Sequence, residues 1–156
     1  LMLRCGLRIS EVAKLELSDL YLSEDTPRML VRGKGSRQRV AYLSDQAVRV
    51  LREHLAARPT VACEYVFLSY KLSGLTTHSI HMRLLHYRNL AGLNLTAHRL
   101  RHSFANDLLN AEMPITSIQK LMGHRWIETT QTYVQANDKQ VQADFRSASQ
   151  KLAGWA

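Results

Sequence analysis

The segment Leu121-Met-Gly-His-Arg-Trp-Ile-Glu-Thr-Thr-Gln-Thr-Tyr133 organises the rest of this chain. In it, His124 follows a glycine, and Tyr133 lies nine residues beyond that histidine. A tyrosine can fill a hydrophobic core, serve as a binding platform or act as a covalent nucleophile. Which role applies depends on the groups that accompany it, and the segments before it carry unusual ones.

The segment Thr96–His102 places two imidazoles and two guanidiniums within seven residues. Such a cluster is costly to bury unless an anion pairs with it. Arginines can hold the non-bridging oxygens of a phosphodiester, imidazoles can move its protons, and a tyrosine hydroxyl can attack its phosphorus. Together the two segments favour chemistry on a phosphodiester.

A metal site is the alternative interpretation of the histidines. His98 and His102 stand four residues apart, which is the spacing of a metal-binding pair on a helix. Arg101 would place a cation beside the metal, however, and no neighbouring carboxylate or thiol completes the ligand set. We therefore expect no metal here, and we expect His102 to make a structural hydrogen bond.

Apolar periodicity predicts helices over 45–55, 77–91, 98–109, 115–122 and 138–152, with a shorter one beginning near a Ser10 cap. Alternating segments at 19–23, 28–32 and 38–43 predict three short strands. The expected fold class is therefore α+β and mostly α-helical, with one small three-stranded antiparallel sheet. We expect Leu90 to face inward, and the apolar stripe of 138–152 is thin for a helix buried in its own domain.

The expected hairpin between the last two strands has Gly33, Lys34 and Gly35 at its tip, where a long cationic side chain can project. A lysine there can simply protect a sheet edge from pairing, and the residues alone leave that interpretation open. The flanking arginines are candidates for phosphate contacts, which position a protein without reading bases. These are Arg32, Arg37 and Arg39.

The expected helix 77–91 carries a basic set that includes His78, His81 and Arg83. Such a helix can cross a DNA backbone or groove. It can equally be an ordinary solvated face, and both interpretations stand.

With 156 residues the chain has the size of one domain, and its formal charge of +8 favours polyanions, nucleic acid before anionic membrane. It has no apolar run of membrane-spanning length and no visible signal peptide, and its two isolated cysteines fit a reducing cytoplasm. The chain does not open with methionine, so we expect it to be part of a longer protein.

Five motifs, in this order, resemble the tyrosine recombinase (phage integrase) family over nearly the whole chain. They are Cys5-Gly-Leu-Arg8-Ile-Ser-Glu11, Gly33-Lys34-Gly-Ser-Arg-Gln-Arg39, His98-x-x-Arg101, Gly123-His124 and Tyr133. The resemblance implies that residues 1–156 form the family's catalytic domain, without its N-terminal core-binding domain. The catalytic residues that it implies are Arg8, Lys34, His98, Arg101, His124 and Tyr133.

By this resemblance, Arg8 and Arg101 grip the scissile phosphate and stabilise the transition state. Tyr133 joins the 3′ phosphate and frees a 5′ hydroxyl, so the bond energy is kept and neither a metal nor another cofactor is needed. His98 is the expected proton acceptor and Lys34 the expected donor to the leaving oxygen. His124 would hydrogen-bond the phosphate.

The resemblance also implies that the partner is double-stranded DNA, with no membrane partner, and that the location is cytoplasmic. On DNA the chain would form a homo-oligomer, which is a tetrameric synapse in the full-length protein. Its C-terminal helix would dock on a neighbouring molecule. Alternatives are a type IB topoisomerase-like enzyme, which relaxes DNA without exchanging partners, and a DNA-binding module of the same fold that lost catalysis. A further alternative is a metal-dependent nuclease. It requires a cluster of carboxylates near the histidines, and no such cluster is present in the sequence, although folding could bring distant acidic residues together.

Overall fold

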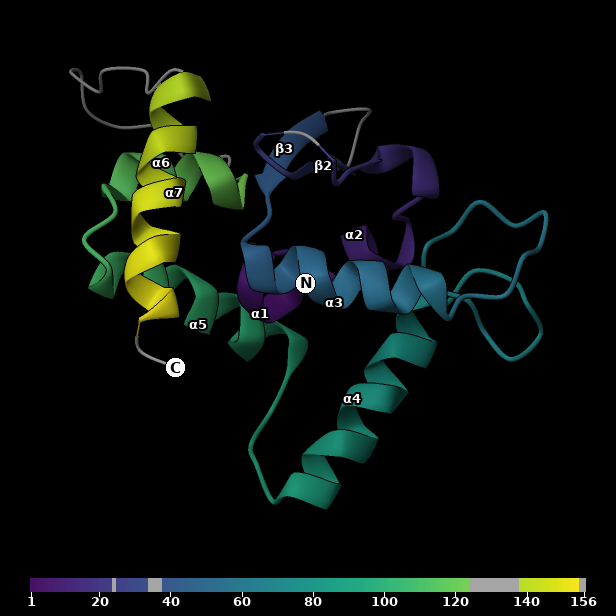
Figure 1. Cartoon of the computed structure of the whole chain (residues 1–156). Helices are drawn as coiled ribbons and strands as arrows, with labels where there is room; N and C mark the ends of the chain where they lie inside the picture. Colours follow the sequence, from purple (N-terminus) through teal and green to yellow (C-terminus); the bar gives the residue numbers. More distant parts are fainter. Residues whose placement is uncertain (24, 34–37, 124–137, 155–156) are drawn as a thin grey trace.

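A computed structural model of the chain describes residues 1–23, 25–33, 38–123 and 138–154. Helices dominate the fold (Figure 1). Three antiparallel strands form one small sheet, which confirms the expected fold class. The elements are α1 (Met2–Cys5), α2 (Ile9–Ala13), the 3-10 helix η1 (Leu17–Asp19), β1 (Leu20–Tyr21), β2 (Arg28–Arg32), β3 (Gln38–Tyr42), α3 (Asp45–Ala56), α4 (Thr77–Ala91), α5 (Ala97–Asn110), α6 (Ile115–Met122) and α7 (Asp138–Ala153).

The sheet has the order β1-β2-β3, and its register decides which side chains point inward. Met29 faces Ala41, and Val31 faces Arg39. Facing residues of an antiparallel pair share one side of the sheet. Because Met29, Val31 and Ala41 are buried, Arg39 lies on the inward side of the hairpin.

Helix α2 begins differently from the prediction, because Arg8 and not Ser10 is its N-cap residue. The Glu11 carboxylate reaches back and accepts the Arg8 backbone N–H at 2.7 Å, as the glutamate of a capping box does. Ser10 lies inside the helix and is exposed. The glutamate three residues after Arg8 was thus the stronger helix-start signal.

Two hydrophobic cores hold the described elements together. The first lies under the sheet and α1 to α4, and its largest fully buried side chains are Leu7, Met29, Val31 and Val66. The second lies among α5, α6 and α7, with Tyr42 of β3 reaching into it. Its buried members include Phe104, Leu108, Ile118 and Phe145.

Gly6 ends α1 at the place where this helix packs on α5, between the two cores. Its φ of +64° belongs to the left-handed region that glycine adopts without cost. A Cβ there would lie 2.5 Å from a ring carbon of Phe104. Its carbonyl accepts a hydrogen bond from Arg101 Nη1, so this glycine also touches the arginine that the sequence singled out.

Helix α4 packs on the body only through its first half, where Ile80 is buried and Leu84 is partly covered. The second half extends away from the other helices (Figure 1). The prediction that Leu90 faces inward is wrong, since 71% of this residue is exposed. The periodicity identified the correct face, but no part of the described chain lies opposite its far end.

Helix α7 packs against α5 and α6 of its own chain. Val141, Phe145 and Ala148 are buried, and the Phe145 ring lies 5.9 Å from that of Tyr42. The prediction that this stripe was too thin to be buried in its own domain is therefore wrong. One large ring flanked by smaller side chains makes a narrow face, which fits against two helices. None of the helices in the described ranges is long and apolar enough to cross a bilayer.

Candidate active site

Three arginines from separate parts of the chain converge on the carboxylate of Glu11. Arg8 precedes α2, Arg39 lies on β3, and Arg101 lies on α5. Arg8 Nη1 donates to Glu11 Oε1 at 2.9 Å, and Arg39 Nη2 donates to Oε2 at 2.8 Å. Arg101 Nη1 lies 4.0 Å from the same Oε2. The cluster therefore brings together both arginines of the predicted catalytic set.

Burial differs within this cluster. The side chain of Glu11 is 4% exposed, and those of Arg101 and Arg39 are 9% and 14% exposed, whereas that of Arg8 is 44% exposed. Burial alone would raise the pKa of Glu11. The Arg39 charge and the hydrogen bonds from Arg8 and Arg39 outweigh burial and hold that pKa below its ordinary value.

The C-terminal end of α6 meets the same three arginines. Three consecutive carbonyl groups there each accept a hydrogen bond from a different guanidinium. The pairs are Leu121 with Arg39 Nη1 at 2.7 Å, Met122 with Arg101 Nη2, and Gly123 with Arg8 Nη2 at 3.4 Å. These carbonyls have no partner inside the helix and form the negative end of its dipole, so they suit cationic donors.

The cluster as a whole remains positively charged, because one carboxylate faces three guanidiniums. Burial, followed by the charges of Arg8 and Arg39, lowers the pKa of Arg101 to about 10. Arg101 is still cationic at neutral pH with that pKa. These four side chains therefore keep an excess of positive charge at a place where Arg8 reaches the surface. This arrangement suits a bound anion with several oxygen acceptors, such as a phosphate.

His98 lies in the first turn of α5, three residues before Arg101, and is exposed. Its ring is perpendicular to that of His102, with the centroids 6.2 Å apart. His102 is exposed as well, so its surroundings are not those of a buried structural histidine. Residues three apart lie on the same side of a helix, so His98 and Arg101 share one side of α5.

The other predicted catalytic residues, Lys34, His124 and Tyr133, lie outside the described residues, as does Arg37. The described chain continues to Gly123, which ends α6 with a φ of +61°, in the left-handed region that favours glycine. His124 follows directly, so the predicted phosphate-binding histidine is adjacent in sequence to the carbonyl that Arg8 contacts.

The candidate DNA-binding residues fall into three settings. Arg32 is half exposed and pairs with Glu16 at 2.9 Å and Asp19 at 3.0 Å. Arg39 points inward to Glu11. The third set, His78, His81 and Arg83, is exposed on α4, which carries no acidic residue.

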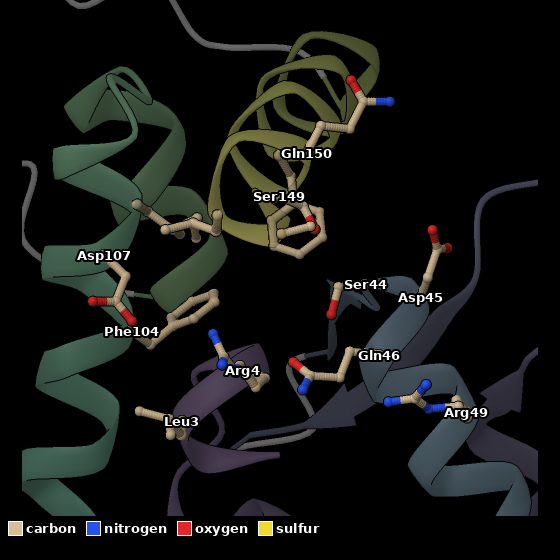
Figure 2. A pocket seen from close by; sticks show the side chains of 14 residues that line it. Leu3, Arg4, Ser44, Asp45, Gln46, Arg49, Phe104, Asp107, Ser149 and Gln150 are labelled. Carbon is tan, nitrogen blue, oxygen red and sulfur yellow. The ribbon is translucent and has the colours of Figure 1, made fainter. Parts of the chain in front are cut away.

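Two hollows in the described structure can be compared with this cluster. One of about 490 Å³ lies among α1, α3, α5 and α7, and its charged lining has both signs (Figure 2). No residue of the arginine cluster lines it. The other, of about 480 Å³, lies between β3, α6 and α7, and Arg39 is part of its wall. Within the described ranges, no three His, Cys, Asp or Glu side chains gather closely enough to hold a metal ion.

Sequence reasoning missed three features of this cluster. Glu11 was part of a quoted motif but was not assigned to the site, although its spacing of three from Arg8 is a capping-box signal. Arg39 was assigned to phosphate contacts, although it lies two residues before Ala41 and therefore on the same, buried side of β3. The Leu121–Gly123 carbonyls have no side-chain signal, so sequence could not reveal them.

The sequence pattern of the phage integrase family matches residues 1–140, and the chain belongs to that family. It is 37% identical over 153 residues to tyrosine recombinase XerC of Myxococcus xanthus, covering 92% of this chain and 50% of the relative. To XerC of Caldanaerobacter subterraneus it is 33% identical over 148 residues, covering 90% of this chain and 41% of the relative. The chain thus spans about half the length of the curated relatives it matches.

Solved structures agree with this assignment. XerA recombinase superposes with a TM-score of 0.75 at 27% identity, covering 93% of this chain and 54% of that one. XerH site-specific recombinase, solved on its difH substrate before cleavage, superposes with a TM-score of 0.69 at 29% identity, covering 80% of this chain and 38% of that one. The tyrosine recombinase fold expected from the motifs is therefore confirmed.

Proposed function

We propose that this chain, residues 1–156, is the catalytic domain of a site-specific DNA recombinase that cuts and rejoins strands through a covalent phosphotyrosine. One observation carries the proposal: Arg8 and Arg101 meet at a buried carboxylate with a surplus of positive charge, in a chain of the phage integrase family. Guanidiniums held in this way are ready to bind a phosphate before the reaction starts, which is how such groups contribute most to catalysis.

In the proposed reaction the hydroxyl oxygen of Tyr133 attacks the phosphorus, and the bond from phosphorus to the 5′ oxygen breaks. The proton of the tyrosine passes to His98, and Lys34 donates a proton to the departing 5′ oxygen. The strand is left as a 3′ phosphotyrosyl ester beside a free 5′ hydroxyl. Attack by another 5′ hydroxyl reverses these steps, so no external energy source takes part.

Arg8, Arg101 and His124 have a different task in this proposal, which is to bind the non-bridging oxygens. The phosphate gains negative charge as the fifth oxygen approaches, and the cationic cluster stabilises that charge more strongly than it stabilises the ground state. Arg8 is exposed enough to meet a ligand directly. Arg101 lies deeper, and its guanidinium also contacts the Gly6 and Met122 carbonyls.

We further propose that double-stranded DNA lies across the exposed face of α4. His78, His81 and Arg83 support this because they are exposed on a helix without any acidic side chain to repel phosphates. Arg32 and Arg37 would add phosphate contacts from the hairpin. Recombination would bring several copies of the chain together on DNA, in the cytoplasm.

The test uses a pool of nicked duplexes with randomised arms, incubated with the chain in the presence of a chelator. Strand cleavage beside the nick releases a short fragment, so the covalent adduct cannot reverse. Adducts that survive denaturing detergent are sequenced to obtain a substrate. We expect adducts with the native chain and none with Tyr133→Phe, while both proteins bind the selected duplex equally. Binding of the duplex pool by the native chain without any adduct would refute the catalytic proposal and favour a DNA-binding module.

A further inference from the structure

Arg39 occupies an unusual position for an arginine of a small surface hairpin. It faces Val31 across the β2–β3 pair, so it lies on the side of the sheet that meets the core. Its Nη2 donates to Glu11 at 2.8 Å and its Nη1 to the Leu121 carbonyl at 2.7 Å. One side chain therefore links the hairpin, the start of α2 and the end of α6.

This placement costs stability. The Arg39 Nε is buried, and it has no hydrogen-bond acceptor in the described part of the chain. An unsatisfied buried donor is unfavourable, and burial lowers the pKa of the guanidinium. An apolar side chain of similar length would fill this inward position without that cost. We therefore attribute the inward position of Arg39 to the two hydrogen bonds of its terminal nitrogens, to Glu11 and to the Leu121 carbonyl.

Both partners of Arg39 lead directly to the arginines of the proposed site. Glu11 also binds the backbone and guanidinium of Arg8. Leu121 begins the run of three carbonyls whose next two members accept from Arg101 and Arg8. The planar fork of an arginine can hold two acceptors in a fixed relation, which the single ammonium of a lysine cannot do.

We propose that Arg39 is a positioning residue: by clamping Glu11 to the C-terminal end of α6, it sets Arg8 and Arg101 in the geometry that binds the scissile phosphate. This inference rests on the proposed function for the identity of the phosphate, but the clamp itself does not depend on it. It replaces the direct phosphate contact that the sequence had suggested for Arg39. Gly123 belongs to the same clamp, since a Cβ there would lie 2.9 Å from Arg39 Cδ.

The first test compares Arg39→Met and Arg39→Lys with a matched control, Arg52→Met. Arg52 is exposed on α3 and donates to the Leu22 carbonyl at 2.9 Å, so its loss removes one charge and one hydrogen bond outside the proposed site. We expect the rate of adduct formation at saturating duplex to fall about 10- to 100-fold in Arg39→Met, because small misplacements of catalytic groups have effects of that size. Arg39→Lys should lose about tenfold, and the control should keep the native rate.

The salt dependence of duplex binding separates positioning from direct contact. A residue that neutralises one phosphate contributes about one to the slope of log Kd against log salt. We expect that slope to be unchanged in both Arg39 variants. A slope reduced by about one, with the native cleavage rate at saturation, would overturn the proposal and restore the direct phosphate contact.

Hydrogen exchange on the chain without DNA tests the clamp independently of activity. Loss of Arg39 should speed amide exchange about tenfold in the last turn of α6 and around Arg8, whereas Arg52→Met should not. Should Arg39→Met fail to fold, Arg39→Lys carries the test, and native exchange together with native cleavage in that variant overturns the proposal. If the Arg39 variants show faster exchange but the native chain forms no adducts, the recombinase function is refuted, while the proposal that Arg39 clamps Glu11 to α6 stands.

Discussion

Replacing Glu11 by glutamine should reduce the stability of the folded chain substantially. The substitution leaves the shape of the side chain nearly unchanged but removes the only negative charge that the described residues place among the three guanidiniums of the cluster. Two of them lose charged hydrogen bonds of 2.9 and 2.8 Å, and the third, Arg101, loses a carboxylate 4.0 Å away. Removing one partner of a buried ion pair costs about 3–5 kcal/mol, and the remaining amide oxygen reduces this to about 3 kcal/mol.

The stability lost in Glu11→Gln should depend on pH, and the pKa of Glu11 determines the direction of that dependence. Glu11 has a lower pKa in the folded chain than in the unfolded chain, where it is about 4.3. The unfolded state therefore binds the proton more tightly, and the stabilisation by Glu11 is complete above the unfolded pKa. It is lost as the pH falls through the folded pKa. The difference in stability between the native chain and Glu11→Gln should be largest near neutral pH and should shrink in acid.

Urea titrations followed by circular dichroism, at intervals between about pH 3 and pH 7, measure this difference directly. Glu53→Gln on the exposed side of α3 is the matched control, and it should change the free energy of unfolding by less than about 0.5 kcal/mol. A Glu11→Gln variant that is as stable as the native chain at pH 7 would refute the reasoning. So would a loss of stability that stays constant down to pH 3, since it would not arise from the charge.

Three further predictions concern packing and reactivity. Gly6→Ala should cost at least about 1 kcal/mol because of its positive φ, and more because of the contact with Phe104. Urea titration measures this loss, and an unchanged stability would show that α1 and α5 can separate without cost. Phe145→Ala should cost about 3–5 kcal/mol and expose the start of α7 to limited proteolysis; native resistance would show that α7 docks weakly on its own chain. Cys5 should react with iodoacetamide far more slowly than the half-buried Cys63, because burial raises the pKa of the Cys5 thiol to about 11. Mass spectrometry of the two cysteine peptides after brief labelling measures this, and faster labelling of Cys5 would contradict it.

Local signals were sufficient to predict most of the fold. The helix over 45–55 follows from its apolar spacing, and the left-handed φ of Gly123 follows from a glycine at a helix end. The hairpin strands follow from alternation around a glycine-rich turn. Each of these features depends on residues a few positions apart, so one sequence contains all the information that they require.

The errors arose where a residue depends on distant parts of the chain. Leu90 fits the apolar periodicity of α4, but its environment is set by the absence of packing elements opposite that half of the helix within the described residues. Ser10 is a good cap by residue type, yet the N-cap residue is Arg8. Its backbone N–H donates to the Glu11 carboxylate, which Arg39 and Arg101 also stabilise. In both places tertiary contacts decided between locally reasonable alternatives.

The candidate site shows the same division. Motif order was enough to predict that Arg8 and Arg101 belong together, and the structure brings both to Glu11. The carbonyls of α6 and the inward position of Arg39 depend on how α6 docks against the sheet, 82 residues away in sequence. Lys34, His124 and Tyr133 lie outside the described residues, so their assignments stay predictions.

The position of the arginine cluster between the two hydrophobic cores links the site to cooperative unfolding. Arg8, Glu11 and Arg39 are attached to the first core, whereas Arg101 and the end of α6 are attached to the second. A partial opening along this seam would leave every helix intact and still dismantle the anion site. During mild heating, affinity for a phosphate should therefore disappear before helical content falls. The same hydrogen bonds then connect the two hydrophobic cores and form the framework of the proposed chemistry.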